Sequence, residues 1–202
     1  FSFVMSERRR TLGLTVPETL VAISLFAVVG TLLVGLLIRT MRISARESVY
    51  LELEQSCHFL LQKVERDLTQ SGVSGISYLQ TPDTSGVAAN RIEDVTSEGT
   101  LAWSGEQTFY YWLKNERTLW VRRITTSASP LANPRRFTES ELTNMTTQHG
   151  TSVGENVTEF AVVNRLPDGS SRLVDVSVEV QRQLPNDQPR RFRLEKLVTI
   201  LN

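Results

Sequence analysis

Apolar residues dominate one unbroken stretch near the start of the chain. Residues 19–38 contain no charged side chain and are rich in Leu, Val, Ile, Ala and Phe. A helix over this stretch rises about 30 Å, which is the thickness of the hydrocarbon core of a bilayer. We therefore expect a membrane-spanning helix over residues 14–40, followed by a soluble domain over residues 41–202.

The helical pattern continues beyond this stretch as an apolar stripe along one face. Apolar residues recur at spacings of three and four, and charged or amide side chains fill the other faces. The stripe consists of Tyr50, Leu53, Cys57, Leu60, Leu61, Val64 and Leu68. Neither Gly nor Pro interrupts residues 36–71, so one helix is predicted from about residue 17 to residue 70. Such a stripe also suits a coiled coil, but the β-rich remainder favours a helix packed on a sheet.

Alternating and β-branched runs in the second half predict antiparallel strands. Residues 107–113 and 118–124 flank a polar tetrapeptide and suggest a hairpin. Residues 157–164 form another candidate strand, and residues 172–182 alternate valines with polar side chains. A last strand is predicted from Phe192, Leu194, Val198 and Ile200. The expected fold class is α+β, with a long N-terminal helix packed on an antiparallel sheet.

The remaining segments are rich in Gly, Ser, Thr, Pro and acidic residues and are predicted to be loops. Gly72 and Gly75 are expected to end the helix and to open a loop over residues 72–106, with a weak strand at residues 100–104. A second long loop is expected over residues 125–156, with a short helix near residues 138–145. Turns are predicted at residues 166–169 and 184–189.

The charge of the chain gives no overall attraction for nucleic acid. Lys and Arg together number 22, as do Asp and Glu, so the formal net charge is zero. Clusters of arginine could still contact DNA, although solvated surface charges explain them more simply. These clusters are Arg122 with Arg123, Arg135 with Arg136, and Arg190, Arg191 and Arg193.

The sequence offers little catalytic chemistry. The single cysteine, Cys57, lies in the helical stripe and is expected to be a small buried apolar residue. Its neighbour His58 would point about 100° away on a helix, and His149 lies in a polar loop, so neither a metal site nor histidine-based catalysis is expected. Because no phosphate loop or nucleophile motif is present, we expect neither an enzyme nor a cofactor.

Glu18 stands at the start of the uncharged stretch, where a carboxylate is unfavourable. A charge deep in a bilayer costs roughly 3 kcal/mol, so Glu18 should have a partner. A cleaved secretory signal does not fit, because the apolar core is too long and no small-residue cleavage site precedes Arg39. A plain signal anchor fits the hydrophobicity but does not explain Glu18. Basic residues lie on both sides of the stretch, so the positive-inside rule only slightly favours a cytoplasmic N-terminus.

The segment Gly13-Leu14-Thr15-Val16-Pro17-Glu18 resembles the class III signal of type IV pilins and type II secretion pseudopilins. That signal is a short basic leader ending in glycine, then an apolar residue, Thr, two further residues, Glu and a long apolar run. The leader here would be residues 1–13 with the basic triplet Arg8, Arg9 and Arg10, and residues 1–4 before Met5 are expected to be extraneous. The resemblance implies cleavage after Gly13 by a prepilin peptidase, N-methylation of Leu14, and pairing of Glu18 with the terminal ammonium of an adjacent subunit.

The later parts of the chain add a diffuse resemblance to minor pseudopilins of the J class and related minor pilins. It covers residues 61–68, the hairpin over residues 109–123 and the strand over residues 197–202. The implied protein is a minor pilin or pseudopilin of the inner membrane, with lipid, other pilins or pseudopilins and the assembly platform as partners. It would be added to a type IV pilus or type II secretion pseudopilus, in an initiating tip complex. The alternative is a signal-anchored extracytoplasmic binding or adhesion module that does not polymerise.

Overall fold

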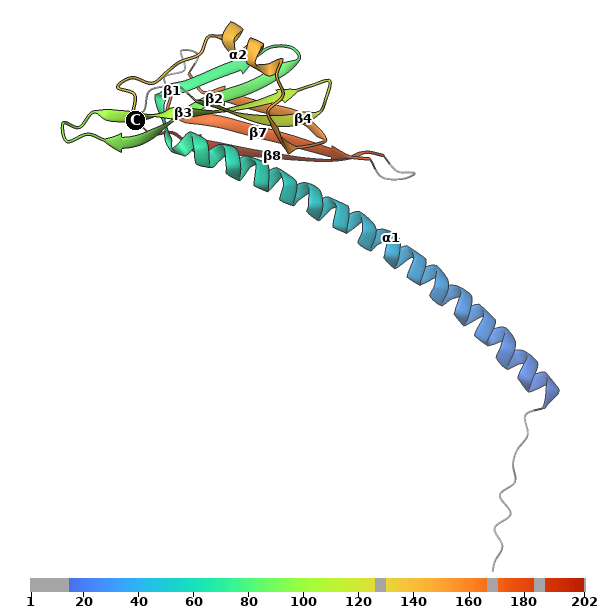
Figure 1. Ribbon diagram of the computed structural model, residues 1–202. Helices are drawn as coiled ribbons and strands as arrows, with labels where there is room; N and C mark the ends of the chain where they lie inside the picture. The colour runs from blue at the N-terminus through green and yellow to red at the C-terminus, as the bar shows by residue number, and fades with distance from the viewer. Residues whose placement is uncertain (1–14, 126–129, 167–170, 184–187, 202) are drawn as a thin grey trace, which may run out of the picture. The chain divides into compact units, whose positions relative to one another are not determined.

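The computed structural model describes residues 15–125, 130–166, 171–183 and 188–201 (Figure 1). These residues form a long apolar N-terminal helix, a short second helix and two antiparallel sheets, which is an α+β fold. The chain divides into two compact units, residues 1–47 and residues 48–202.

The long helix α1 (Val16–Thr69) confirms the predicted single helix almost to the residue. Its second half, in the unit of residues 48–202, buries the apolar stripe against the sheets. The buried members of the stripe are Leu53, Cys57, Leu60, Leu61, Val64 and Leu68. Tyr50 at the edge of the stripe stays 48% exposed and meets the ring of Phe192 edge-on, at 5.3 Å between centroids. The stripe therefore packs on a sheet, as predicted.

Five strands form the first sheet in the order β1-β2-β3-β4-β5. Their bounds are β1 (Ser71–Gln80), β2 (Thr84–Val95), β3 (Leu101–Leu113), β4 (Thr118–Thr125) and β5 (Thr151–Gly154). The predicted hairpin is confirmed as β3 and β4, which pair from Leu113 with Thr118 to Glu106 with Thr125. The weak strand predicted at residues 100–104 is the beginning of β3, and the short strand β5 lies inside the second predicted loop.

The prediction of a loop over residues 72–106 is wrong, because most of this segment is paired strand. Gly72 and Gly75 do not open a loop but lie in β1, beside the indole of Trp103. A Cβ at Gly75 would lie 2.5 Å from the Trp103 ring and 3.1 Å from the carbonyl oxygen of Asn90. The glycines thus make room for a buried tryptophan, a reason for glycine in a strand that composition does not reveal.

Three strands form the second sheet in the order β6-β7-β8. These strands, β6 (Val157–Asn164), β7 (Leu173–Arg182) and β8 (Arg190–Thr199), confirm the three predicted strands. The alternating valines of β7 are buried as expected, namely Val174, Val176, Val178 and Val180. The predicted turns at residues 166–169 and 184–189 lie mostly outside the described residues.

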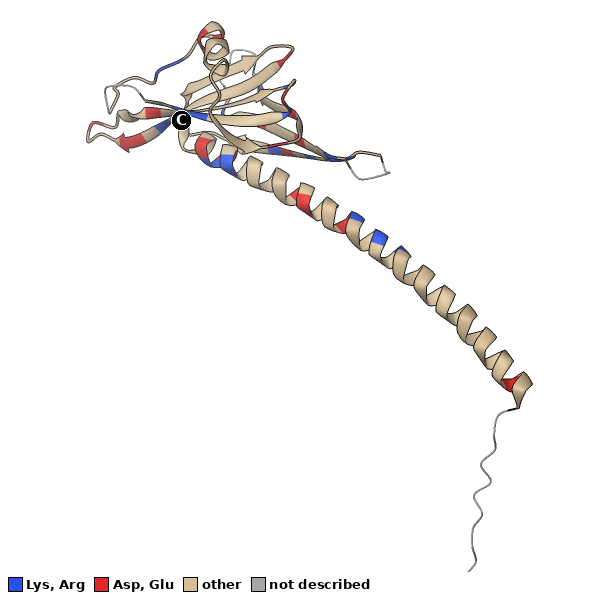
Figure 2. Ribbon diagram, turned by 45° about the vertical axis from the view of Figure 1, so that its right-hand side comes forward, with Lys and Arg blue, Asp and Glu red and all other residues tan. Residues whose placement is uncertain are grey.

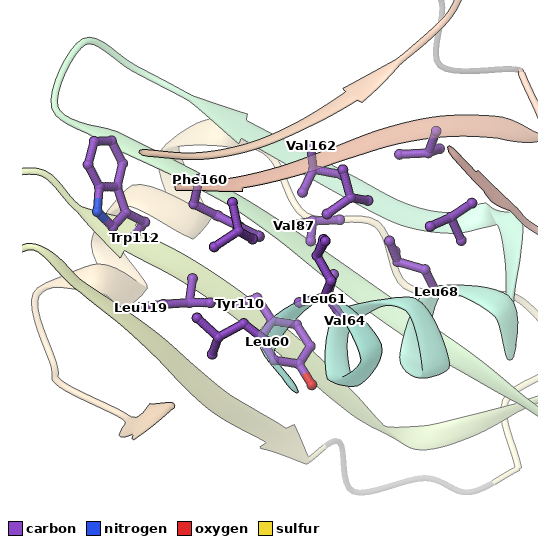
Figure 3. Packing of buried hydrophobic residues seen from close by; sticks show 14 of the residues in the cluster. Leu60, Leu61, Val64, Leu68, Val87, Tyr110, Trp112, Leu119, Phe160 and Val162 are labelled. Carbon is purple, nitrogen blue, oxygen red and sulfur yellow. The ribbon is translucent and has the colours of Figure 1, made fainter. Parts of the chain in front are cut away.

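One apolar core joins α1 to both sheets. Figure 3 shows α1 side chains such as Leu61 and Val64 meeting Val87 of β2 and Val162 of β6. The indole N–H of Trp112 in β3 crosses between the sheets and donates to the carbonyl oxygen of Val157, at 2.9 Å.

A second, smaller core lies on the other face of the five-stranded sheet, under α2 (Glu139–Thr146). This helix confirms the short helix predicted near residues 138–145. It begins with a capping box in which the Thr138 hydroxyl accepts from the Glu141 N–H and the Glu141 carboxylate accepts from the Thr138 N–H. Leu142 of α2 and Phe137 just before it cover Phe109 and Tyr111 of β3.

Candidate functional site

The N-terminal half of α1 presents its apolar side chains to the outside. Phe26 is 81% exposed and Leu32 is 69% exposed. By length and composition α1 could cross a membrane, as a secretion signal also could. No residue of its most apolar part is buried within the chain. Figure 2 shows this part of α1 without charged residues, between one acidic position at the start of the helix and the basic positions that begin at Arg39.

The polar side chains inside the apolar stretch are satisfied by the helix itself. The hydroxyl of Ser24, for example, donates to the carbonyl oxygen of Val21 at 2.8 Å. The same kind of bond to a carbonyl of the preceding turn is made by Thr19 and Thr31, and by Thr40 just after the stretch. Because these hydroxyls need no outside partner, they are compatible with hydrocarbon around the helix.

Glu18 is held in the first turn of α1 by Thr15. Its Oε2 accepts hydrogen bonds from both the backbone N–H and the hydroxyl of Thr15, each at 2.9 Å. The first helical bond runs from the N–H of Thr19 to the carbonyl oxygen of Thr15, at 3.1 Å. Thr15 is therefore in the N-cap position with Glu18 three residues later, the spacing of a capping box. A carboxylate in this position also interacts favourably with the N-terminal end of the helix dipole.

Glu18 has a hydrogen-bond partner within its own chain. The cost of a carboxylate near lipid calls for a partner of Glu18, and the chain itself supplies two hydrogen bonds to Oε2. Among the residues that the structure describes, none donates a hydrogen bond to Oε1 of Glu18. The other predicted processing and leader residues lie outside the described residues; these are Arg8, Arg9, Arg10, Gly13 and Leu14.

Cys57 occupies a site that suits a buried thiol and not a nucleophile. It is fully buried in the core, and its Sγ lies 3.4 Å from the carbonyl oxygen of Phe192 in β8. Burial raises the pKa of the thiol to about 11, so it stays protonated at neutral pH. The prediction of a buried apolar role for Cys57 is confirmed.

The two histidines lie apart and each meets one carboxylate. His58 is on α1, with Nε2 3.9 Å from Glu54. His149 stacks on Trp120 with 4.8 Å between ring centroids, and its Nε2 is 3.7 Å from Glu116. Within the described ranges no three His, Cys, Asp or Glu side chains come together in a way that could hold a metal ion.

The arginine clusters are dispersed, and most of these arginines are engaged within the chain. Arg122 donates to the carbonyl oxygen of Met145 at 3.1 Å, and Arg136 donates to the carbonyl oxygen of Ser74 at 2.7 Å. Four others pair with carboxylates, namely Arg123 with Glu106, Arg135 with Glu141, Arg191 with Glu179, and Arg193 with Glu159 and Glu195. The charges of most of these arginines are therefore compensated within the chain, which weakens the case for contact with a phosphate backbone.

A polar cleft that the sequence did not predict lies where the end of α1 meets β2, β3 and β4. Asp67 is at its base, 5% exposed, and accepts a hydrogen bond of 2.7 Å from the hydroxyl of Tyr110. One feature of the sequence could have indicated it. Asp67 falls three residues after Val64 and seven after Leu60, so it is a charged residue on the apolar stripe.

Comparisons with known proteins give no further identification. No protein-family model, no curated protein and no solved structure matches the chain. The resemblance of residues 13–18 to prepilin signals therefore remains a hypothesis about function.

Proposed function

We propose that the chain is a minor pilin or pseudopilin. It is inserted in the inner membrane, processed after Gly13 by a prepilin peptidase, and added by an assembly platform to a type IV pilus or type II secretion pseudopilus. Other pilins or pseudopilins and membrane lipid are its partners, and its soluble domain is extracytoplasmic. The proposal assigns the protein no catalytic role and no cofactor.

One observation carries most of this proposal. A single uninterrupted helix combines an exposed, uncharged N-terminal stretch with a C-terminal stripe that is buried against antiparallel sheets. A simple membrane anchor needs only the first part, and it has no need to continue as a structural element of the soluble domain. A subunit whose helix bundles with its neighbours needs both parts in one continuous helix. Glu18 at the first turn supports the proposal, with Oε2 already hydrogen-bonded and Oε1 available for an ammonium.

A second candidate is the anchored binding module that never polymerises. The contact between Thr15 and Glu18 favours it, because a carboxylate with a local capping role requires no neighbouring subunit. The two candidates differ in their processing, since the module keeps its leader and remains a membrane protein without filaments.

Processing is the experiment that separates them. The full chain is co-expressed with a prepilin peptidase, and the N-terminus of the product is determined by mass spectrometry. We expect a product that begins at Leu14 and carries an N-methyl group. Gly13→Val should block cleavage, whereas Gly35→Ala, where an added Cβ meets nothing within 4 Å, should be cleaved like the parent chain. An intact leader in the parent chain would exclude the filament proposal.

A further inference from the structure

The polar cleft at the end of α1 has an excess of positive charge. It encloses about 160 Å³ between α1, β2, β3 and β4, which is too small for a cofactor but large enough for a side chain. Four cationic side chains line it, namely Lys63, Arg66, Arg91 and Arg123. Its acidic side chains are Asp67 and Glu106, so the lining carries a net charge of +2, four positive minus two negative.

Both acidic side chains of the cleft are already engaged. Asp67 accepts from Tyr110 at 2.7 Å, and its other oxygen lies 3.5 Å from Nε of Arg66. Glu106 lies 3.5 Å from Nε of Arg123. Lys63 and Arg91 form no ion pair with any residue in the described part of the chain. Two cations from different elements thus face the same cleft with their charges uncompensated.

An exposed aromatic side chain lies next to this cleft. Phe59 is 58% exposed and lines a second hollow together with Gln62, Lys63 and Arg66. Lys63 and Arg66 line both hollows, so the cleft and the aromatic ring form one continuous surface. Lys63 follows Phe59 by four residues, which places both on one face of α1. A small free anion would use only the cleft, whereas Phe59 offers contact to an apolar group attached to that anion.

We propose that Phe59, Lys63, Arg66, Arg91 and Arg123 form a docking surface for an acidic segment of a partner protein. A carboxylate of the partner enters the cleft between Lys63 and Arg91, and an apolar side chain close to it in the partner packs on Phe59. Charge-assisted hydrogen bonds and an aromatic contact beside them are the usual means by which such surfaces gain affinity and specificity. The inference does not rest on the filament proposal, because it concerns only the folded domain.

The test measures binding of a labelled peptide to the full chain in non-ionic detergent. The probe is a fluorescein-labelled Glu-Asp-Leu-Glu peptide, and the uncharged control is Gln-Asn-Leu-Gln, both followed by fluorescence anisotropy at constant ionic strength. We expect saturable binding of the acidic peptide alone. Lys63→Ala, Arg91→Ala and Phe59→Ala should each weaken it about tenfold, the loss expected for one charge-assisted or anchoring contact.

Matched variants make the result specific. Lys114→Ala and Arg172→Ala remove the same charges from exposed positions outside the cleft and should leave the affinity unchanged. Equal losses in these variants, or no saturable binding to the parent chain, would overturn the proposal. Inorganic phosphate is titrated as a separate ligand. If phosphate binds with the same dependence on Lys63 and Arg91 while Phe59→Ala has no effect on the peptide, the cleft is a small-anion site and the docking proposal is wrong.

Discussion

The hydroxyl of Tyr110 donates a hydrogen bond of 2.7 Å to Oδ2 of Asp67, and both residues are buried. Figure 3 shows the Tyr110 ring reaching from β3 toward the helix that carries Leu60 and Leu61. Burial, followed by this bond and the charge of Asp67, raises the pKa of Tyr110 well above its ordinary value, so the phenol remains a donor. The bond joins the last turn of α1 to the five-stranded sheet.

Tyr110→Phe should destabilise the soluble domain, because it removes the donor and leaves a buried carboxylate with a weaker set of partners. We expect a loss of about 1–3 kcal/mol in the free energy of unfolding. Denaturant titration followed by tryptophan fluorescence measures this loss, because Trp103, Trp112 and Trp120 all lie in the unit of residues 48–202. Tyr50→Phe is the control, since Tyr50 is half-exposed, and a loss of equal size there would contradict the role of the bond to Asp67.

The domain should lose stability at alkaline pH through Cys57. The pKa of the thiol is about 11 in the folded chain and about 8.5 when unfolded, so the folded state retains the proton over the interval between these values. The buried thiol therefore contributes to the free energy of unfolding, and this contribution is fully present below about pH 8.5, the pKa of the unfolded chain. It is lost as the pH rises toward 11, by an amount on the order of 3 kcal/mol. Denaturant titrations at pH 8 and pH 10 measure how far the free energy of unfolding falls between these two values. This fall should be smaller in Cys57→Ala than in the parent chain. Identical pH dependence in both proteins would contradict this role of burial.

Gly75→Ala should destabilise the sheet because its Cβ would lie 2.5 Å from the Trp103 ring. Overpacking of this kind usually costs about 1–3 kcal/mol. The adjacent Ser74 is exposed, so Ser74→Ala adds no bulk to the core and should be nearly neutral. Equilibrium unfolding of the two variants provides the measurement, and equal stability of both would show that Trp103 adjusts freely.

Leu60→Ala should reveal how strongly α1 contributes to the soluble domain. Leu60 is 2% exposed and lies in the core shared by α1 and the sheets, so its truncation should cost about 2–5 kcal/mol. Phe59, the residue directly before Leu60, has a larger but exposed side chain. Phe59→Ala should therefore lower the free energy of unfolding far less than Leu60→Ala. Thermal unfolding compares the two variants, and a similar loss in both would argue against helix-on-sheet packing as the main source of stability.

Glu18→Gln separates charge from capping at the first turn of α1. The amide oxygen can still accept from Thr15, but the side chain no longer pairs with an ammonium, so filament incorporation should fall at least about tenfold while membrane insertion persists. Thr15→Val removes only the hydroxyl donor to Glu18 and should have a smaller effect. The measurement is the fraction of the chain in sheared filaments relative to that in membranes. A different outcome would contradict this role of the charge. If Glu18→Gln enters filaments normally while Thr15→Val enters them poorly, Glu18 acts only as a helix cap.

Local periodicity determined the elements that the sequence predicted correctly. Helix α1, the β3–β4 hairpin, the short helix α2 and strands β6 to β8 each repeat a pattern of apolar positions or carry a capping signal within a few residues. Such patterns need no knowledge of the partner element, because burial on one face is enough to produce them. The uncharged stretch of residues 19–38 and the position of Glu18 were likewise evident from the sequence alone.

Long-range contacts decided the rest. Strand β1 was missed because Gly72 and Gly75 resemble loop residues until Trp103 is placed against them. Strand β2 was missed because Gly86 also resembles a loop residue until the backbone of Tyr110 is placed beside it. The partner of Asp67 is 43 residues away in the chain, and the cleft takes Lys63 from the helix and Arg91 and Arg123 from different strands. These features exist only when separate segments meet, since a hydrogen bond, a cavity or an excess of charge depends on distance in space and not on spacing along the chain.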